Sequence, residues 1–169
     1  MNNNPTIQPK QESTFRENQP VHQPRKRVDI VSIKLVKESS LLYKGRTIRS
    51  PQDGYELAKQ YLGEVDREHF IVVCLDTKNH PTCINTSHIG SLNASIVSVR
   101  EVFKTAIVSN SASIIVFHNH PSGQLQPSKE DIDVTKRLVE AGKIIGIDVI
   151  DHLILGDESF VSLKEKGYL

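Results

Sequence analysis

The amino-acid sequence predicts an α/β or α+β fold, in which helices cover a β-sheet. Apolar runs that are too short for buried helices alternate along the chain with segments whose apolar residues recur at helical spacing. Strands that alternate with helices in this way are typical of a sheet with helical layers. The length of 169 residues, with 37% hydrophobic and 24% charged residues, indicates one domain with a modest core and a tail.

The first part of the chain is predicted to be a disordered tail, residues 1–27. This segment is rich in Asn, Gln, Pro and charge and has almost no large apolar residues, so it cannot bury enough surface to offset its ordering entropy. Its last residues, 25–27, form a short basic run. Such a run can contact phosphate, although it is more often a solvated flank.

Residues 28–65 are predicted to be an N-terminal extension made of a strand and a helix. Apolar and polar positions alternate over residues 28–37, which is the two-residue period of a half-buried strand. After a hairpin-like stretch, Ser50 and Pro51 predict a helix start and Gly63 its end.

Residues 66–169 are predicted to hold the main domain. The continuous apolar run at residues 70–75 indicates a central strand, and residues 81–89 return beside it. The same patterns predict, in order, a loop at residues 90–93, a helix at 99–110, a strand at 113–117, a helix that begins at Ser128, a strand at 147–155 and a short hairpin strand at 159–162.

Charge, cysteine content and hydropathy limit the classes of partner and compartment. A formal net charge of +1 gives no field that would require nucleic acid, an anionic membrane or an acidic substrate. No segment approaches the ~20 apolar residues of a membrane span. Cys74 and Cys83 form no CxxC pair and are interpreted as reduced structural thiols. We therefore expect a soluble cytoplasmic protein.

Two histidines that follow the strand at 113–117 form the candidate site. Side chains two apart on a strand point the same way, so His118 and His120 can present imidazoles to one point. Asp131 is a natural third ligand if the Pro- and Gly-containing loop returns, and two imidazoles with a carboxylate suit catalytic Zn²⁺. Ser128 and Asp131 also resemble a helix capping box, so a purely structural interpretation stays open.

The residues around this site resemble a known family. The order His, one residue, His, seven residues, Ser, two residues, Asp is similar to the signature of the JAMM (MPN-plus) metalloprotease superfamily. From about Asp66 onward the chain resembles the RadC-like branch of that superfamily, on the segments LDTKN, GSLNAS, REVFKTAI, FHNHPSG, PSKEDI, TKRL and DHLILGD. The resemblance implies an MPN/JAB-like fold with a mixed central β-sheet flanked by helices.

The resemblance also implies roles for particular residues. His118, His120 and Asp131 would ligate zinc, Ser128 would steady a developing oxyanion, and an upstream glutamate would be the general base. Glu68 occupies that position, while Glu64 and Glu101 remain alternatives. His152, beside Asp151 inside a strand, is interpreted as a satisfied structural histidine, and no supporting hydrogen bond from Asp151 to a ligand is predicted.

The implied function is zinc-dependent hydrolysis of a peptide or isopeptide-like amide bond in an unknown peptide or protein substrate. One alternative is a metal-dependent nuclease or DNA-repair factor, since activated water also attacks phosphorus. Full-length family members usually carry a helix-hairpin-helix region, and no such pattern occurs here, so neither this feature nor the charge favours nucleic acid. A second alternative is a non-catalytic interaction module. The sequence predicts no oligomeric state.

Overall fold

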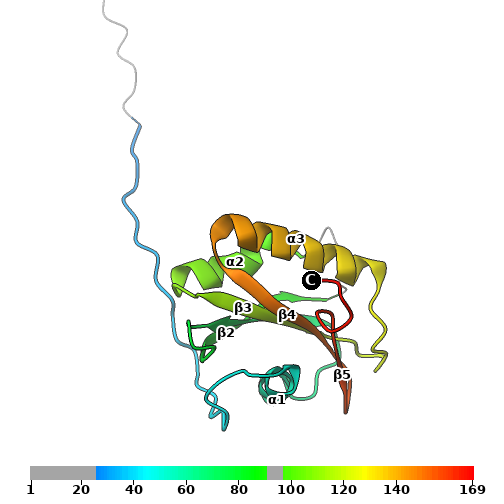
Figure 1. The fold of residues 1–169 in the computed structure, drawn as a ribbon. Coiled ribbons are helices and arrows are strands. Elements are labelled where there is room, and N and C mark those ends of the chain that lie inside the picture. Colours follow the sequence, from blue (N-terminus) through cyan, green and yellow to red (C-terminus); the bar gives the residue numbers. More distant parts are fainter. Residues whose placement is uncertain (1–25, 91–96) are drawn as a thin grey trace, which may run out of the picture. The chain divides into compact units, whose positions relative to one another are not determined.

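The computed structural model describes residues 26–90 and 97–169. The chain divides into two units, residues 1–32 and 33–169. The described part of the second unit has the mixed sheet with helices on its faces that the sequence predicts (Figure 1). Most of the predicted disordered tail at 1–27, and residues 91–93 of the predicted loop at 90–93, lie outside the described residues. The predicted divisions at residues 27 and 65 stay predictions.

The elements follow the predicted order. They are α1 (Pro51–Leu62), β1 (His69–Leu75), β2 (Pro81–Ile89), α2 (Val99–Val108), β3 (Ser113–Asn119), α3 (Lys129–Ile145), β4 (Asp148–Leu155) and β5 (Phe160–Ser162). The strands form one sheet in the order β2-β1-β3-β4-β5. Only β3 and β4 are parallel among these described strands. Parallel neighbours need a crossover connection, which α3 supplies.

The prediction of a strand at residues 28–37 is wrong. Residues 26–49 contain neither helix nor strand, and the side chains of Val28, Ile30 and Val31 are 84%, 102% and 78% exposed. The alternation in this segment is interrupted where apolar residues are adjacent, at residues 30–31 and 35–36, and a strand also needs a neighbour that satisfies its N–H and C=O groups. None of the described strand pairs includes residues 28–37.

Alternate residues of the central strands face two separate cores. α2 and α3 lie on one side of the sheet and α1 on the other (Figure 1). In β1, Phe70 and Cys74 join the core under α2 and α3, whereas Ile71 joins the core under α1. In β3, Val116 faces α2 and α3, so His118, two residues later, continues on that face. The alternation therefore places His118 on the side of the sheet that carries α3.

Both ends of α1 agree with the sequence prediction. Ser50 Oγ accepts a hydrogen bond from Asp53 N at 3.3 Å, and Asp53 Oδ2 accepts one from Ser50 N at 3.0 Å. This reciprocal pair is a capping box. Gly63 ends the helix at a φ of +62°, in the left-handed region that favours glycine.

Among the residues that the structure describes, no helix has the length and apolar character needed to cross a membrane.

Candidate metal centre

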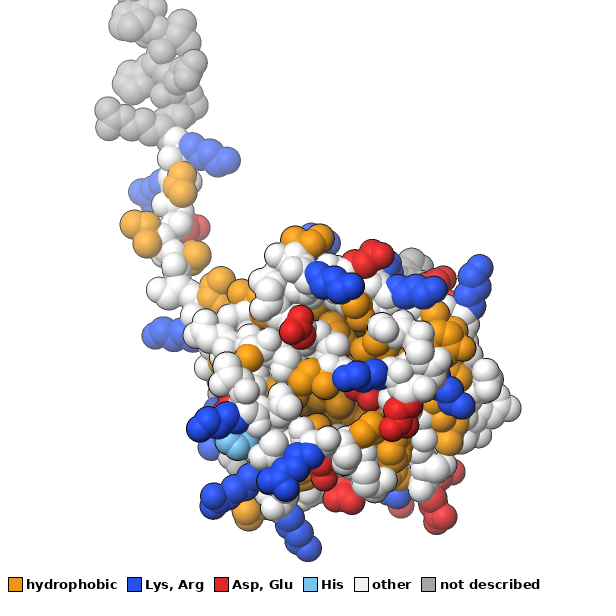
Figure 2. Space-filling view, viewed as in Figure 1, with side chains coloured by type: hydrophobic (Ala, Val, Ile, Leu, Met, Phe, Trp, Pro, Cys, Tyr) orange, Lys and Arg blue, Asp and Glu red, His pale blue; other side chains and the backbone are white. Residues whose placement is uncertain are grey.

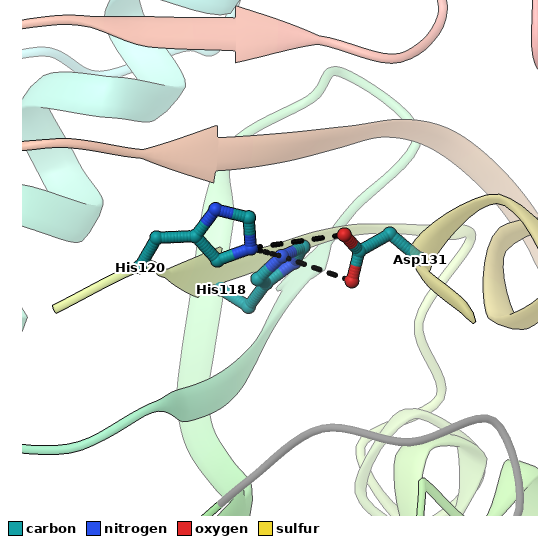
Figure 3. Close-up of side chains that lie close together, drawn as sticks. All are labelled: His118, His120 and Asp131. Atoms are coloured by element: carbon teal, nitrogen blue, oxygen red, sulfur yellow. Dashed lines mark hydrogen bonds and ion pairs between the residues drawn. The ribbon is translucent and has the colours of Figure 1, made fainter. Parts of the chain in front are cut away.

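Two imidazoles and one carboxylate converge where β3 meets the start of α3. His118 Nε2 lies 3.0 Å from His120 Nε2. Asp131 Oδ1 is 3.2 Å from His118 Nε2, and Asp131 Oδ2 is 3.7 Å from His120 Nε2. Figure 3 shows the three side chains pointing toward one another, with Asp131 coming from the helix. One ligand atom from each residue lies within 4.8 Å of the others.

The helix cap that begins α3 also orients Asp131. Ser128 Oγ accepts a hydrogen bond from Asp131 N at 3.1 Å, while Ser128 N and Ser128 Oγ donate to Asp131 Oδ2 at 2.8 and 2.6 Å. Asp131 Oδ1 is left to face His118. The capping box and the convergence are thus one arrangement, because the contacts that cap the helix aim the carboxylate at the histidines.

The loop between β3 and α3 fixes the ring of His120. Gly123 N donates to His120 O at 2.9 Å in a tight turn, where Gly123 has a φ of +71°. The carbonyl of Gln124 can only accept a hydrogen bond, so His120 Nδ1 is the donor in their 2.5 Å contact. The proton of a neutral His120 ring is therefore on Nδ1, and its Nε2 lone pair faces Asp131 and His118.

A buried chain of hydrogen bonds connects His118 to Asp131 through His152 and Thr135. His118 Nδ1 is 2.8 Å from His152 Nε2, and His152 Nδ1 is 2.6 Å from Thr135 Oγ1. Thr135 Oγ1 donates to Asp131 O at 2.7 Å. Because that hydroxyl proton is used, His152 Nδ1 donates to Thr135, and His118 Nδ1 then donates to His152. The neutral ring of His118 therefore carries its proton on Nδ1. Its Nε2 has no proton, and the lone pair of that atom faces Asp131 and His120.

The charges of the cluster follow from burial and from these contacts. Burial lowers the pKa of His118 and holds the pKa of His152 well below its usual value, so both rings are neutral. The hydrogen bond with Asp131 raises the pKa of His120. Burial alone would raise the pKa of Asp131, but its contacts with the two histidines and the hydrogen bonds from Ser128 outweigh burial and hold that pKa well below the usual value. Asp131 is therefore an anion among nitrogen donors.

The donor set fits a divalent transition-metal ion. Both Nδ1 atoms are bonded to protein groups, whereas both Nε2 atoms and the carboxylate face one another. Two imidazoles and one carboxylate are ligands that catalytic zinc sites use with a fourth position open. Hydrogen bonds from the non-ligating ring nitrogens are the usual support of metal-bound histidines.

Glu68 lies directly before β1, beside the two histidines. Phe70 pairs with His118 across β1 and β3, so residue 68 is close to the end of β3. Burial is the main cause of the lowered pKa of His118, and Asp131 is the main cause of the raised pKa of His120. The charge of Glu68 acts on both histidines and raises the pKa of each. Glu68 is half-buried.

Asn119 fixes the backbone on both sides of Glu68. Its Oδ1 accepts from His69 N at 2.8 Å and its Nδ2 donates to Arg67 O at 3.0 Å. Glu68 O in turn accepts from Gly90 N at 2.8 Å. Because Asn119 stands between His118 and His120 in the sequence, the same strand end positions both the histidines and the residue proposed as the base.

The two competing glutamates occupy different surroundings. Glu101 is exposed on α2 and forms an ion pair with Lys104 at 2.6 Å. Glu64 is exposed after the end of α1 and lines a cavity of about 500 Å³ whose wall also includes His120. Lys59, Asp157 and Glu158 complete the charged part of that wall. Of the three clustered residues, only His120 lines this cavity.

His152 and Asn119 are the site residues that the sequence analysis did not identify. His152 is a satisfied histidine, as expected, but its partner is His118 of the candidate metal cluster. Asp151 instead accepts hydrogen bonds from Ser162 Oγ, His152 N and Lys164 N, so it stabilises β5 and the chain after it. A signal for His152 exists only in the strand register, since Val116 pairs with His152 across β3 and β4.

We expect His152→Phe to weaken zinc binding by about 10–100-fold, the usual cost of losing a hydrogen-bond partner of a metal-bound histidine. Phe keeps an aromatic ring in this fully buried position but offers no acceptor to His118 Nδ1. Zinc affinity is measured by competition with a chelator of known affinity. Thr135→Val is the matched control, because it breaks the far end of the chain and leaves the His118–His152 contact; its effect should be smaller. Equal affinity of the His152 variant and the wild type would refute this role.

Comparison with known proteins places the chain beside one family. A family model described as the RadC-like JAB domain matches residues 48–168. A UPF0758 protein of Geobacillus sp. (strain WCH70) is 58% identical over 132 residues, which are 78% of this chain and 58% of that protein. UPF0758 protein YsxA of Bacillus subtilis (strain 168) is 55% identical over 122 residues, which are 72% of this chain and 53% of the relative. The chain thus spans little more than half the length of these relatives.

Proposed function

Because the chain belongs to the RadC-like JAB domain family, we propose that it is a zinc-dependent hydrolase of a peptide or isopeptide-like amide bond. The observation that carries the proposal is the convergence of His118 Nε2, His120 Nε2 and the Asp131 carboxylate, with Glu68 beside them. A zinc ion held by these ligands would supply Lewis acidity and an acidified water molecule.

The protein's own groups would carry the proton and hold the developing charge. Glu68 would accept a proton from the attacking water and return it to the leaving amine. Ser128 is the candidate for the oxyanion. Its Oγ already donates to Asp131 Oδ2 at 2.6 Å, so this hydroxyl would have to turn before it donates to substrate.

Support for an amide rather than a phosphodiester substrate comes from the ligand count and the charge. Phosphodiesterases that use two ions need a second group of ligands, and within residues 26–90 and 97–169 the one candidate cluster is His118, His120 and Asp131. The formal net charge is +1, and Figure 2 shows acidic and basic side chains on the same face. Nucleic-acid binding draws its affinity mainly from basic groups that neutralise phosphates.

The test compares the two reactions under the same conditions. The full chain is loaded with zinc and incubated with a mixture of end-blocked peptides, an isopeptide between a lysine side chain and a peptide carboxyl end, and bis(p-nitrophenyl) phosphate. We expect new amino groups from at least one amide substrate, loss of the activity with chelator and recovery with zinc. Phosphodiester cleavage alone would favour the nuclease alternative, and no cleavage by zinc-loaded protein would favour an interaction module.

A further inference from the structure

Cys74 and Cys83 lie directly opposite each other in neighbouring strands. The two are register partners in the antiparallel pair of β1 and β2. Such partners have Cα atoms ~4.5 or ~5.5 Å apart, and both spacings fall within the range of ~4.4–6.8 Å that a disulfide spans. Both side chains face the core under α2 and α3, and each thiol is the largest cause of the shift in the other's pKa, which is raised for Cys74 and lowered for Cys83. Both are free thiols in the structure.

The two thiols have different access to solvent and a polar neighbourhood. Cys74 is 0% exposed, whereas Cys83 is only half-buried. Ser109, at the end of α2, and Ser111 hydrogen-bond to each other through their hydroxyls at 2.7 Å, and both lower the pKa of Cys74 against the effects of Cys83 and burial. The hydrogen bond from Cys74 is the main cause that lowers the pKa of Cys83 to about 6, and Ser109 and Thr82 add to it against burial. Cys83 is the accessible nucleophile and Cys74 its buried partner.

We propose that Cys83 is a site of oxidation by peroxide and that it then closes a disulfide with Cys74 between β1 and β2. In the first step the Cys83 thiolate attacks one oxygen of hydrogen peroxide, the O–O bond breaks and hydroxide leaves. The sulfur is oxidised by two electrons to a sulfenic acid. In the second step Cys74 loses its proton and attacks the Cys83 sulfur, which forms the S–S bond and releases the sulfenic oxygen as water. Two thiols and one peroxide give one disulfide and two waters.

The oxidation site is separate from the metal centre. Cys74 pairs with Ile114 on β3, and His118 is four residues further along that strand. Four residues of strand span ~13 Å. Neither cysteine belongs to the cluster formed by His118, His120 and Asp131. The proposal therefore does not depend on the proposed hydrolase function, and metal-free protein should form the same disulfide.

The test uses the full chain, which has two cysteines, so an intramolecular disulfide can join only Cys74 and Cys83. Metal-free protein is treated with a small excess of hydrogen peroxide, and free thiols are counted before and after. We expect both titratable thiols to be lost, a mass lower by two hydrogen atoms, a peptide that links Cys74 to Cys83 and full recovery with dithiothreitol. Two unreacted thiols, or a disulfide between two chains, would overturn the proposal.

Two variants separate the steps. Cys74→Ser should stop at a Cys83 sulfenic acid that dimedone traps, whereas Cys83→Ser should leave the buried Cys74 unreacted on the same time scale. Equal oxidation of Cys74 in the Cys83→Ser protein would contradict the assigned order. The peptide map of the wild type decides the main claim even if a variant fails to fold.

Discussion

Glu68→Gln is expected to reduce turnover of an amide substrate by about 10²–10⁴-fold, the usual contribution of a general acid–base group, with unchanged zinc content. The amide of Gln cannot accept and return a proton, yet it nearly matches the size of the carboxylate. Asn119 still holds the backbone on both sides of residue 68 in this variant. The measurement is kcat on the substrate found in the amide assay, together with zinc per chain.

Matched substitutions of the two competing glutamates control this result. Glu64→Gln changes an exposed wall of the cavity, and Glu101→Gln removes an exposed ion pair with Lys104. We expect Glu101→Gln to be near wild type in kcat, and Glu64→Gln to act mainly on KM. If Glu68→Gln retained full turnover while Glu64→Gln lost it, the base would be Glu64.

His118→Ala is expected to abolish stoichiometric zinc binding and with it all metal-dependent activity. The loss of zinc affinity should be larger than the ~10–100-fold that removal of a supporting hydrogen bond costs, because His118 would supply one of the three ligand atoms. His118 is fully buried, and its removal also leaves His152 Nε2 without a donor. An unsatisfied buried polar group costs about 1–3 kcal/mol, so the free energy of unfolding should also fall.

His80→Ala is the matched control for His118→Ala. His80 is half-buried at a turn and bonds Asp76 at 2.9 Å, away from the cluster. Zinc per chain and thermal unfolding are measured for both variants and for the wild type. We expect His80→Ala to bind zinc like the wild type. Loss of zinc in both variants would show that the His118 effect is not specific to the site.

Most of the fold followed from local patterns, because each element has its own period or cap. The apolar runs of β1 and β3, the helix start at Ser50 and the capping box at Ser128 depend only on neighbouring residues. The prediction of a strand at residues 28–37 failed because alternation describes side chains and contains no information on a partner strand. Val28 and Val31 would face opposite sides of such a strand, and both side chains are exposed.

The part of the site that depends on strand and helix geometry alone was predictable from the sequence. His118 and His120 are two apart at a strand end, and Asp131 lies in the first turn of the helix that follows. His152 and Asn119 were not predictable, because their partners are distant in sequence and depend on register. The parallel pairing of β3 with β4 brings His152 to His118, and the antiparallel pairing of β3 with β1 brings Asn119 to His69.

X-ray absorption at the zinc edge of the reconstituted wild-type protein tests the central claim most directly, since it reports which atoms bind the ion. We expect a first shell of nitrogen and oxygen at ~2.0–2.2 Å, with the multiple-scattering signal of two imidazoles and no sulfur. The imidazole signal should disappear in the His118→Ala protein because the ion is no longer held. Sulfur at ~2.3 Å would assign the ion to a cysteine, and a shell without imidazole would contradict the site formed by His118, His120 and Asp131.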